Sequence, residues 1–236
     1  MPYTTTTLAA LRADLQARYD AVPFWTDTDA RDALNEAMRQ FNLFTGYWRG
    51  TSTSVTGVGA RFISVPAALT YRTRVFVSGR VITRKSLAEF YRMRRNWRTQ
   101  TTTSGSPVPS TIQEWAPIGL GQIALWPADA AGGTSLSIDG IKLTPTLSAD
   151  GDTLDLGTEE HAILLDEALY ILAFKRPSLL EQMQPRHQAF LQGCLARNEL
   201  LRGSAYFRRV LGLPSMEEQS RMRRKAESDS PLETLG

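Results

Sequence analysis

The 236-residue sequence is poor in the side chains that form cross-links and metal sites. It has one cysteine, Cys194, and two histidines, His161 and His187. A single cysteine excludes an intramolecular disulfide and a cysteine-based metal site, and it fits a chain made in a reducing compartment. The two histidines lie in separate segments, and the HExxH spacing of zinc peptidases is missing. The composition gives no support to a metalloenzyme.

The sequence also lacks the marks of a targeting or membrane-spanning segment. Residues 1–16 have no basic region followed by a continuous apolar core, the pattern of a signal peptide. No apolar run approaches the roughly 20 residues that cross a bilayer. Apolar residues make up 42% and charged residues 22% of the chain, as in ordinary globular proteins. We expect a protein that is soluble or becomes part of a larger assembly, with no membrane partner.

Catalytic motifs are missing as well. Asp150-Gly151-Asp152, with Asp155, matches only a fragment of a calcium loop, and a polar turn is the favoured interpretation. The glycine pairs at 57–59 and 119–121 lack the third glycine of a dinucleotide site, and no phosphate-binding GKS or GKT is present. His161 lies beside acidic residues, but a structural or solvated histidine is favoured there. We therefore predict that the protein is not an enzyme and uses no cofactor or metal.

The most strongly patterned stretch runs from Asp27 to Arg49 and predicts a long amphipathic helix. Its apolar residues recur at steps of three and four, so they share one face. Thr26 or Asp27 is placed to cap the first free amides, and Gly46 suits the left-handed conformation that ends a helix. We expect the stripe to form a core with the helix over 159–174, through Leu34, Ala37, Met38, Phe41, Leu164, Leu169 and Leu172.

Further helices are predicted on either side of a block with strand character. A first helix is expected at 8–19, and Thr158 is the expected cap of the helix at 159–174, which Pro177 ends. Pro185 is expected in the first turn of a last helix that reaches about residue 202. The middle block predicts strands at 51–55, 61–65, 71–77, 80–83, 112–116, 122–126 and 135–143, a hairpin turn at Ser78-Gly79, and a short helix at 84–97.

The order of these elements predicts an α+β fold with a discontinuous helical bundle. Residues 1–50 and 156–213 would form the bundle, and 51–155 an inserted, small antiparallel β domain with one short helix. Residues 214–236 are mostly charged and polar, so we expect an extended tail that orders against a partner. Because tryptophan is enriched at interfaces, Trp25, Trp48 and Trp97 are candidates for subunit contacts.

The succession of landmarks resembles the head-to-tail connector (adaptor) proteins of tailed bacteriophages, in the variety with a β domain inserted into a helical bundle. The resemblance covers roughly residues 8–201. It rests on the long helix that ends in Thr45-Gly46-Tyr47-Trp48-Arg49, on Trp126-Pro127-Ala128-Asp129, and on the helix start at Glu160-His161.

The resemblance implies a structural virion protein that is made in the host cytoplasm and assembles at the head–tail junction. Similar proteins form a ring, usually of twelve copies, beneath the portal protein, with a tail or nozzle protein on the distal side. The ring extends the channel through which double-stranded DNA passes without sequence-specific binding. The C-terminal segment of similar proteins reaches the portal, which makes the following residues candidates for portal binding: Arg208, Arg209, Arg221, Met222, Arg223, Arg224 and Lys225.

Two alternatives remain open from the sequence. Basic residues cluster within 84–98 and 208–225, so a nucleic-acid-binding module is the runner-up, although the formal net charge is only +3. Arginine stems that cover apolar surface would explain the first cluster equally well. A small hydrolase or lyase with its site in the β domain is a third interpretation, which would need a metal requirement or a dependence on His161.

Overall fold

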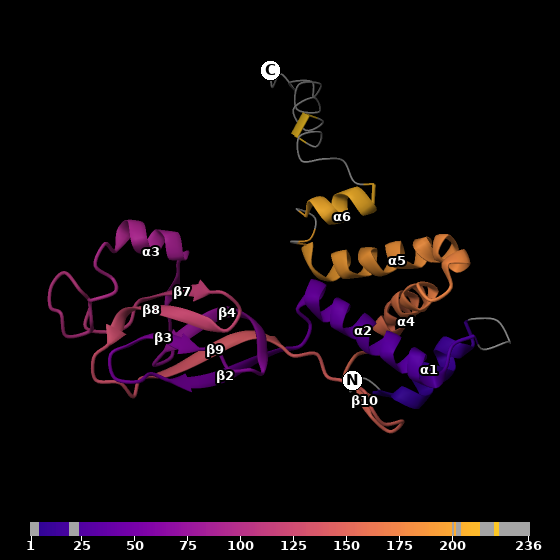
Figure 1. The fold of residues 1–236 in the computed structure, drawn as a ribbon, viewed down its shortest axis with the longest axis horizontal. Coiled ribbons are helices and arrows are strands. Elements are labelled where there is room, and N and C mark those ends of the chain that lie inside the picture. Colours follow the sequence, from indigo (N-terminus) through magenta and orange to yellow (C-terminus); the bar gives the residue numbers. More distant parts are fainter. Residues whose placement is uncertain (1–4, 19–23, 200, 202–203, 213–219, 222–236) are drawn as a thin grey trace, which may run out of the picture. The chain divides into compact units, whose positions relative to one another are not determined.

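The computed structural model describes residues 5–18, 24–199, 201, 204–212 and 220–221. The chain divides into two compact units (Figure 1). Unit 1 combines Met1–Thr45 with Pro145–Gly236, and unit 2 is the continuous stretch Gly46–Thr144 between them. These boundaries differ from the predicted ones, because residues 46–50 belong to unit 2 and residues 145–155 to unit 1.

Local hydrogen bonds explain both shifts in the boundaries. Arg49 and Gly50 already pair with the last strand of unit 2, opposite Ile141 and Gly140. The returning chain is held in unit 1 by Asn35, whose side-chain amide donates to the Leu147 carbonyl at 2.9 Å and accepts from the Leu147 N–H at 2.8 Å. Asn35 and Leu147 are both buried, so this bidentate contact fixes the chain soon after it leaves unit 2.

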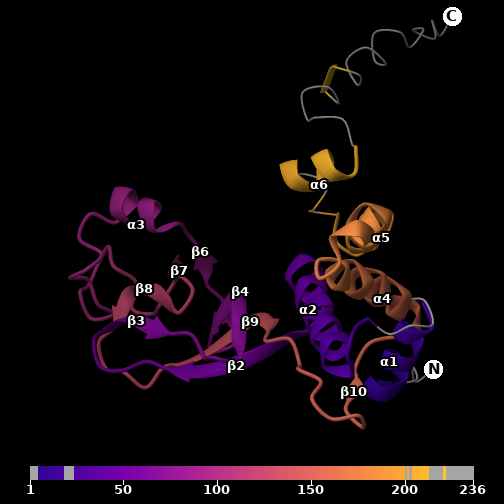
Figure 2. The ribbon, with the colours of Figure 1, turned by 45° about the vertical axis from the view of Figure 1, so that its right-hand side comes forward.

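Unit 1 is helical, with one small sheet (Figure 2). The helix α4 is apolar on several sides because it packs against α1, α2 and α5. All seven predicted core residues of the bundle are buried. The two-stranded antiparallel sheet, which was not predicted, brings the N-terminal strand beside the segment before α4. The elements are β1 (Thr6–Thr7), α1 (Leu8–Gln16), α2 (Asp27–Thr45), β10 (Thr153–Leu154), α4 (Thr158–Ala173), α5 (Pro177–Arg197) and α6 (Ala205–Val210).

The helix ends follow the predicted signals in some places and not in others. Thr26 caps α2, because its hydroxyl accepts from the Asp29 N–H while the Asp29 carboxylate accepts from the Thr26 N–H. Gly46 follows with a φ of +61°, as predicted. Thr158 was predicted as a cap but is the first residue of α4; Gly157 occupies the cap position without a side-chain hydrogen bond.

Of the two proline assignments in the C-terminal half, the one for Pro177 was confirmed and the one for Pro185 was wrong. Pro177, predicted to end one helix, also begins the next, where a missing N–H costs nothing because first-turn amides have no helical partner. Pro185, predicted in a first turn, lies inside α5. The last long helix is therefore α5 over Pro177–Arg197 rather than a helix over 185–202.

Unit 2 consists of two four-stranded sheets. The first has the strand order β2-β9-β4-β5 and the second β3-β8-β7-β6. Ile63, Val75, Ile123 and Ile138 belong to one core cluster to which both sheets contribute, so the sheets pack face to face. The elements are β2 (Arg49–Val55), β3 (Ala60–Ser64), β4 (Leu69–Val77), β5 (Arg80–Val81), β6 (Thr83–Arg84), α3 (Leu87–Met93), β7 (Glu114–Ile118), β8 (Gln122–Asp129) and β9 (Ser135–Lys142).

The predicted strand at 80–83 is divided between the two sheets. The hairpin turn predicted at Ser78-Gly79 is present, with positive φ at both residues, and β5 pairs with β4 beyond it. The chain then crosses at the buried Ile82, and β6 pairs with β7 in parallel. The prediction of a purely antiparallel domain was therefore wrong for this one pair.

The short helix of unit 2 covers the outer face of the second sheet. The capping box between Ser86 and Glu89 begins α3, which ends at Met93 rather than at the predicted residue 97. Phe90 and Trp97 pack there with Ala116, Ala124 and Trp126. Trp97 is 1% exposed and Trp25, in unit 1, is 6% exposed. Because each is enclosed in the core of its own unit, neither offers a surface to a second copy, and Trp48 is half-buried.

Candidate functional site

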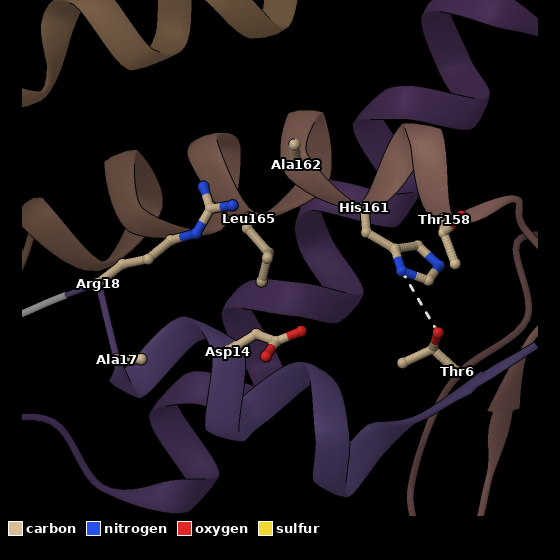
Figure 3. Close-up of a pocket in the computed structure, with 8 residues that line it drawn as sticks. All are labelled: Thr6, Asp14, Ala17, Arg18, Thr158, His161, Ala162 and Leu165. Carbon is tan, nitrogen blue, oxygen red and sulfur yellow. Dashed lines mark hydrogen bonds between the residues drawn. The ribbon is translucent and has the colours of Figure 1, made fainter.

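A cavity of about 560 Å³ in unit 1 lies between the end of α1 and the start of α4 (Figure 3). Its lining residues are Thr6, Asp14, Ala17, Arg18, Thr158, His161, Ala162 and Leu165. Its lining combines one of the two histidines with an acidic and a basic side chain. Whether His161 belongs to a reactive site depends on how its two ring nitrogens are bonded.

The hydrogen bonds of His161 favour a structural role. The Leu156 carbonyl can only accept, so Nε2 donates to it at 3.3 Å. Nδ1 lies 3.3 Å from the Thr6 hydroxyl and accepts from it in this tautomer. Both ring nitrogens thus hold β1 and the segment before α4 in place. Arg18 is likewise engaged, at 3.2 Å from Asp166, which also binds Arg186.

The second histidine, for which no role was predicted, lies in a polar cluster whose centre is buried. His187 Nδ1 is 2.8 Å from the Glu167 carboxyl oxygen Oε2, and Nε2 is 3.4 Å from the Tyr206 hydroxyl. The Tyr170 ring stacks on the imidazole at 4.4 Å. Glu167 is 1% exposed and His187 9%, whereas Tyr206 is 43% exposed, so the cluster joins α4, α5 and α6 with only its Glu167–His187 pair away from water. Twenty residues separate Glu167 from His187, and no local spacing in the sequence indicates this contact.

Cys194 and Tyr206 do not have the properties of nucleophiles. Burial, with the nearby Glu167, raises the pKa of the Cys194 thiol to about 12. The same two causes raise the pKa of the Tyr206 hydroxyl. A reactive thiol or phenol needs a lowered pKa, and here both groups are held in their protonated forms. The cluster is suited to fastening α6 to the bundle rather than to catalysis.

Part of the predicted portal-binding set lies on α6. Phe207 is 2% exposed and packs edge-on against Phe44, with ring centroids 5.2 Å apart. Arg208 is buried and Arg209 exposed on this helix, and Arg221 is exposed. Arg208 is therefore part of the α6 packing rather than a free surface group. Met222, Arg223, Arg224 and Lys225 lie outside the described residues.

Arg94 and Arg98 of the basic cluster in unit 2 lie against aromatic rings of the same unit. The Arg94 guanidinium lies 4.0 Å from the Trp126 ring centroid and binds Glu114 at 2.9 Å. Arg98 lies over the Tyr91 ring at 5.3 Å. Arg72, 4% exposed, donates to the backbone carbonyls of 119, 120 and 122. These contacts favour arginine stems that cover apolar surface over a phosphate-binding surface.

A smaller cavity of about 220 Å³ lies beside this cluster in unit 2. Phe62 and Tyr91 line it and are 46% and 48% exposed. Leu87, Ile118 and the buried Trp97 complete its apolar wall. Arg98 and Gln122 also line it, so the wall is apolar with a charged and a polar side chain in it.

Across the parts of the chain that the structure describes, no group of three or more histidine, cysteine, aspartate or glutamate side chains is placed to hold a metal ion. In the same ranges no helix combines the length and the apolar character that a membrane crossing requires.

The two units, with polar clusters that fasten their own elements, define a structural or interaction protein. The particular family follows from comparison with known sequences. The family model of the SU10 adaptor protein matches residues 6–211, so the chain belongs to that family, a family of bacteriophage structural adaptor proteins. A search of individual characterised proteins gave no match to this chain.

Proposed function

We propose that this protein is the head-to-tail adaptor of a tailed bacteriophage and forms a ring beneath the portal, with the twelve copies that the resemblance implies. In this position it would extend the DNA channel toward a tail or nozzle protein on the distal side. The observation that carries the proposal is the family match, which spans most of both units. The engaged histidines and arginines of the two units are consistent with a structural rather than a chemical task.

The C-terminal segment is the proposed portal-binding part. The family match ends at residue 211, directly after α6, and the segment beyond it is mostly charged and polar. A chain of 20 residues reaches on the order of 65–70 Å when extended. Alternating arginine and glutamate can order on a partner through ion pairs. The helix α6, fastened by Phe207 and Tyr206, would then be the fixed point from which the segment extends.

Native mass spectrometry, on the protein alone and after mixing with the portal, tests the proposal. We expect a ring, or a protein that forms no ring alone but joins the portal in a fixed number of copies. Truncation after Leu213 should leave the melting curve unchanged, because it leaves α6 and its contacts intact. It should abolish portal binding, because it removes the proposed portal-binding segment. A full-length chain that ignores the portal and retains nucleic acid would support the alternative function. A truncated chain that unfolds would contradict the assigned role of the segment.

A further inference from the structure

The strand β2 lies at one edge of the first sheet in unit 2, and no strand of the described residues pairs with its outer side (Figure 1 and Figure 2). It pairs with β9 over all seven residues, from Arg49 opposite Ile141 to Val55 opposite Ser135, without a break in register. Such a regular edge presents a row of backbone groups to any strand that approaches it.

The register identifies which backbone groups face outward. Hydrogen bonds from Lys142 N to Trp48 O and from Thr56 N to Thr134 O show that even-numbered residues bond to β9. Successive residues of a strand alternate in direction. The odd-numbered residues therefore point their N–H and C=O groups away from the sheet. These four residues are Arg49, Thr51, Thr53 and Val55, and their side chains are exposed.

The other edge strands of unit 2 are short or irregular and β2 is not. The part of β4 that extends beyond β5 has two register shifts and carries Arg72 and Arg74. Strands β5 and β6 have two residues each, and β3 has a register shift between Ala60 and Phe62. Both of the two-residue strands also carry an arginine. Residues 50–55 of β2 contain no charge, no proline and no bulge, which are the devices that keep an edge from pairing.

We propose that β2 is a docking edge for β2 of a second copy of this chain, paired antiparallel about a two-fold axis at Ser52. In this register Arg49 faces Val55 of the second copy, and Thr51 faces Thr53. The four facing pairs exchange two hydrogen bonds each, so every outward backbone group of both strands is satisfied. A slip by two residues would leave one outward residue at each end unpaired.

The side chains fit the same register. On the exposed face the threonines meet one another, a favourable cross-strand pair, and the two arginines stay apart at opposite ends. On the other face Ser52 meets Ser52 of the second copy and Ser54 meets Gly50, so no bulky group blocks the approach. The edge strand β2 is therefore complementary to itself. The two-residue edge strands β5 and β6, which each carry an arginine, offer it no matching partner.

A pairing of one strand from each copy is small. Interfaces below about 1,200 Å² are typical of weak, reversible complexes. We therefore expect a dimer whose population rises with protein concentration. A two-fold contact joins two copies only, so this edge is separate from the head-to-tail contact of a ring, and the two proposals stand or fall independently.

Sedimentation equilibrium of the full chain over a range of concentrations tests the pairing, with Thr53→Pro as the disrupting variant and Thr53→Ala as its control. The Thr53 N–H points outward, so proline removes a donor that β9 does not use, and its ring obstructs the second strand. We expect Thr53→Ala to dimerise like the unaltered chain and Thr53→Pro to dimerise at least tenfold more weakly. An unaltered chain that stays monomeric, or a Thr53→Pro chain that dimerises as well as the unaltered chain, would overturn the proposal.

Oxidative cross-linking tests the register and does not depend on proline being tolerated. Ser52 alone faces itself across the axis, in a pair without hydrogen bonds whose Cβ atoms lie close enough for a disulfide. Ser52→Cys should therefore form a covalent dimer, and Ser54→Cys, on the same face, should not. The native Cys194 does not interfere, because it is buried and its pKa is raised. Equal cross-linking of both variants, or of neither, would refute this register.

Discussion

At the scale of single residues, buried polar side chains hold unit 1 together. Glu167 has one hydrogen bond to a described side chain, that with His187, and both residues are buried. Asn35 and His161 tie the chain on either side of β10 to α2 and to β1. A buried polar group costs little when it is paired and much when its partner is removed. The contribution of these buried polar side chains to stability should therefore show most clearly when both partners of a contact are substituted together.

The Glu167–His187 contact predicts a non-additive effect on stability. His187→Leu should lower the free energy of unfolding by about 3 kcal/mol, because it leaves a buried carboxyl group without its partner. The double variant Glu167→Leu with His187→Leu should be more stable than His187→Leu alone. Urea unfolding of the two single variants and the double variant measures the coupling. Additive losses would show that the contact contributes no specific stabilisation.

Asp29 predicts a dependence of stability on pH. Hydrogen bonds from Lys175 and then from the Thr26 backbone and hydroxyl lower the pKa of Asp29 from 3.8 to about 2. Because the folded-state pKa is the lower one, the contribution is complete above about pH 4 and is lost as the pH falls toward about 2. Asp29→Asn should be less stable than the unaltered chain at neutral pH, and urea unfolding should show this difference shrinking through that window. A difference that stays constant with pH would exclude Asp29 as its source.

At the scale of elements, the two prolines of α5 make opposite contributions. Pro185 lies inside the helix, is exposed, and provides no N–H for the carbonyl of residue 181. Pro185→Ala should raise the free energy of unfolding by about 1–3 kcal/mol, because it restores that hydrogen bond. Pro177→Ala is the matched control and should be neutral or slightly destabilising, because proline is well suited to the first turn. Thermal melts of both variants test the contrast, which fails if the two substitutions shift the midpoint equally.

The same elements show what the sequence allowed to be predicted. Helix α2, its Thr26 cap and Gly46 follow from spacing and local chemistry within the segment itself. The pairing of β1 with β10 and of β6 with β7 was missed, because two-residue strands have no periodicity and their partners lie far along the chain. The Glu167–His187–Tyr206 cluster was also missed, because its members lie on three different helices. Local signals specify an element, and its partners depend on packing that no single segment encodes.

At the scale of the whole molecule, the chain enters and leaves unit 2 at one place. The Lys142 N–H donates to the Trp48 carbonyl at 2.7 Å, so the first and last strands of the unit lie side by side. Adjacent ends are typical of a domain inserted into a loop of another, because the host chain is interrupted without being stretched. Unit 2 also has its own core, between its two sheets. Every described residue of that core cluster belongs to unit 2.

This arrangement predicts that residues 46–144 fold when expressed alone. The fragment keeps both sheets, and its buried Trp97, Trp115 and Trp126 should give a blue-shifted fluorescence that is lost in one cooperative urea transition. Ile138→Asp is the control, because an unpaired charge in the shared core should unfold the fragment. A fragment without a cooperative transition would mean that unit 2 draws stability from unit 1, and the adaptor would then have to be treated as one folding unit rather than as a bundle carrying a second domain.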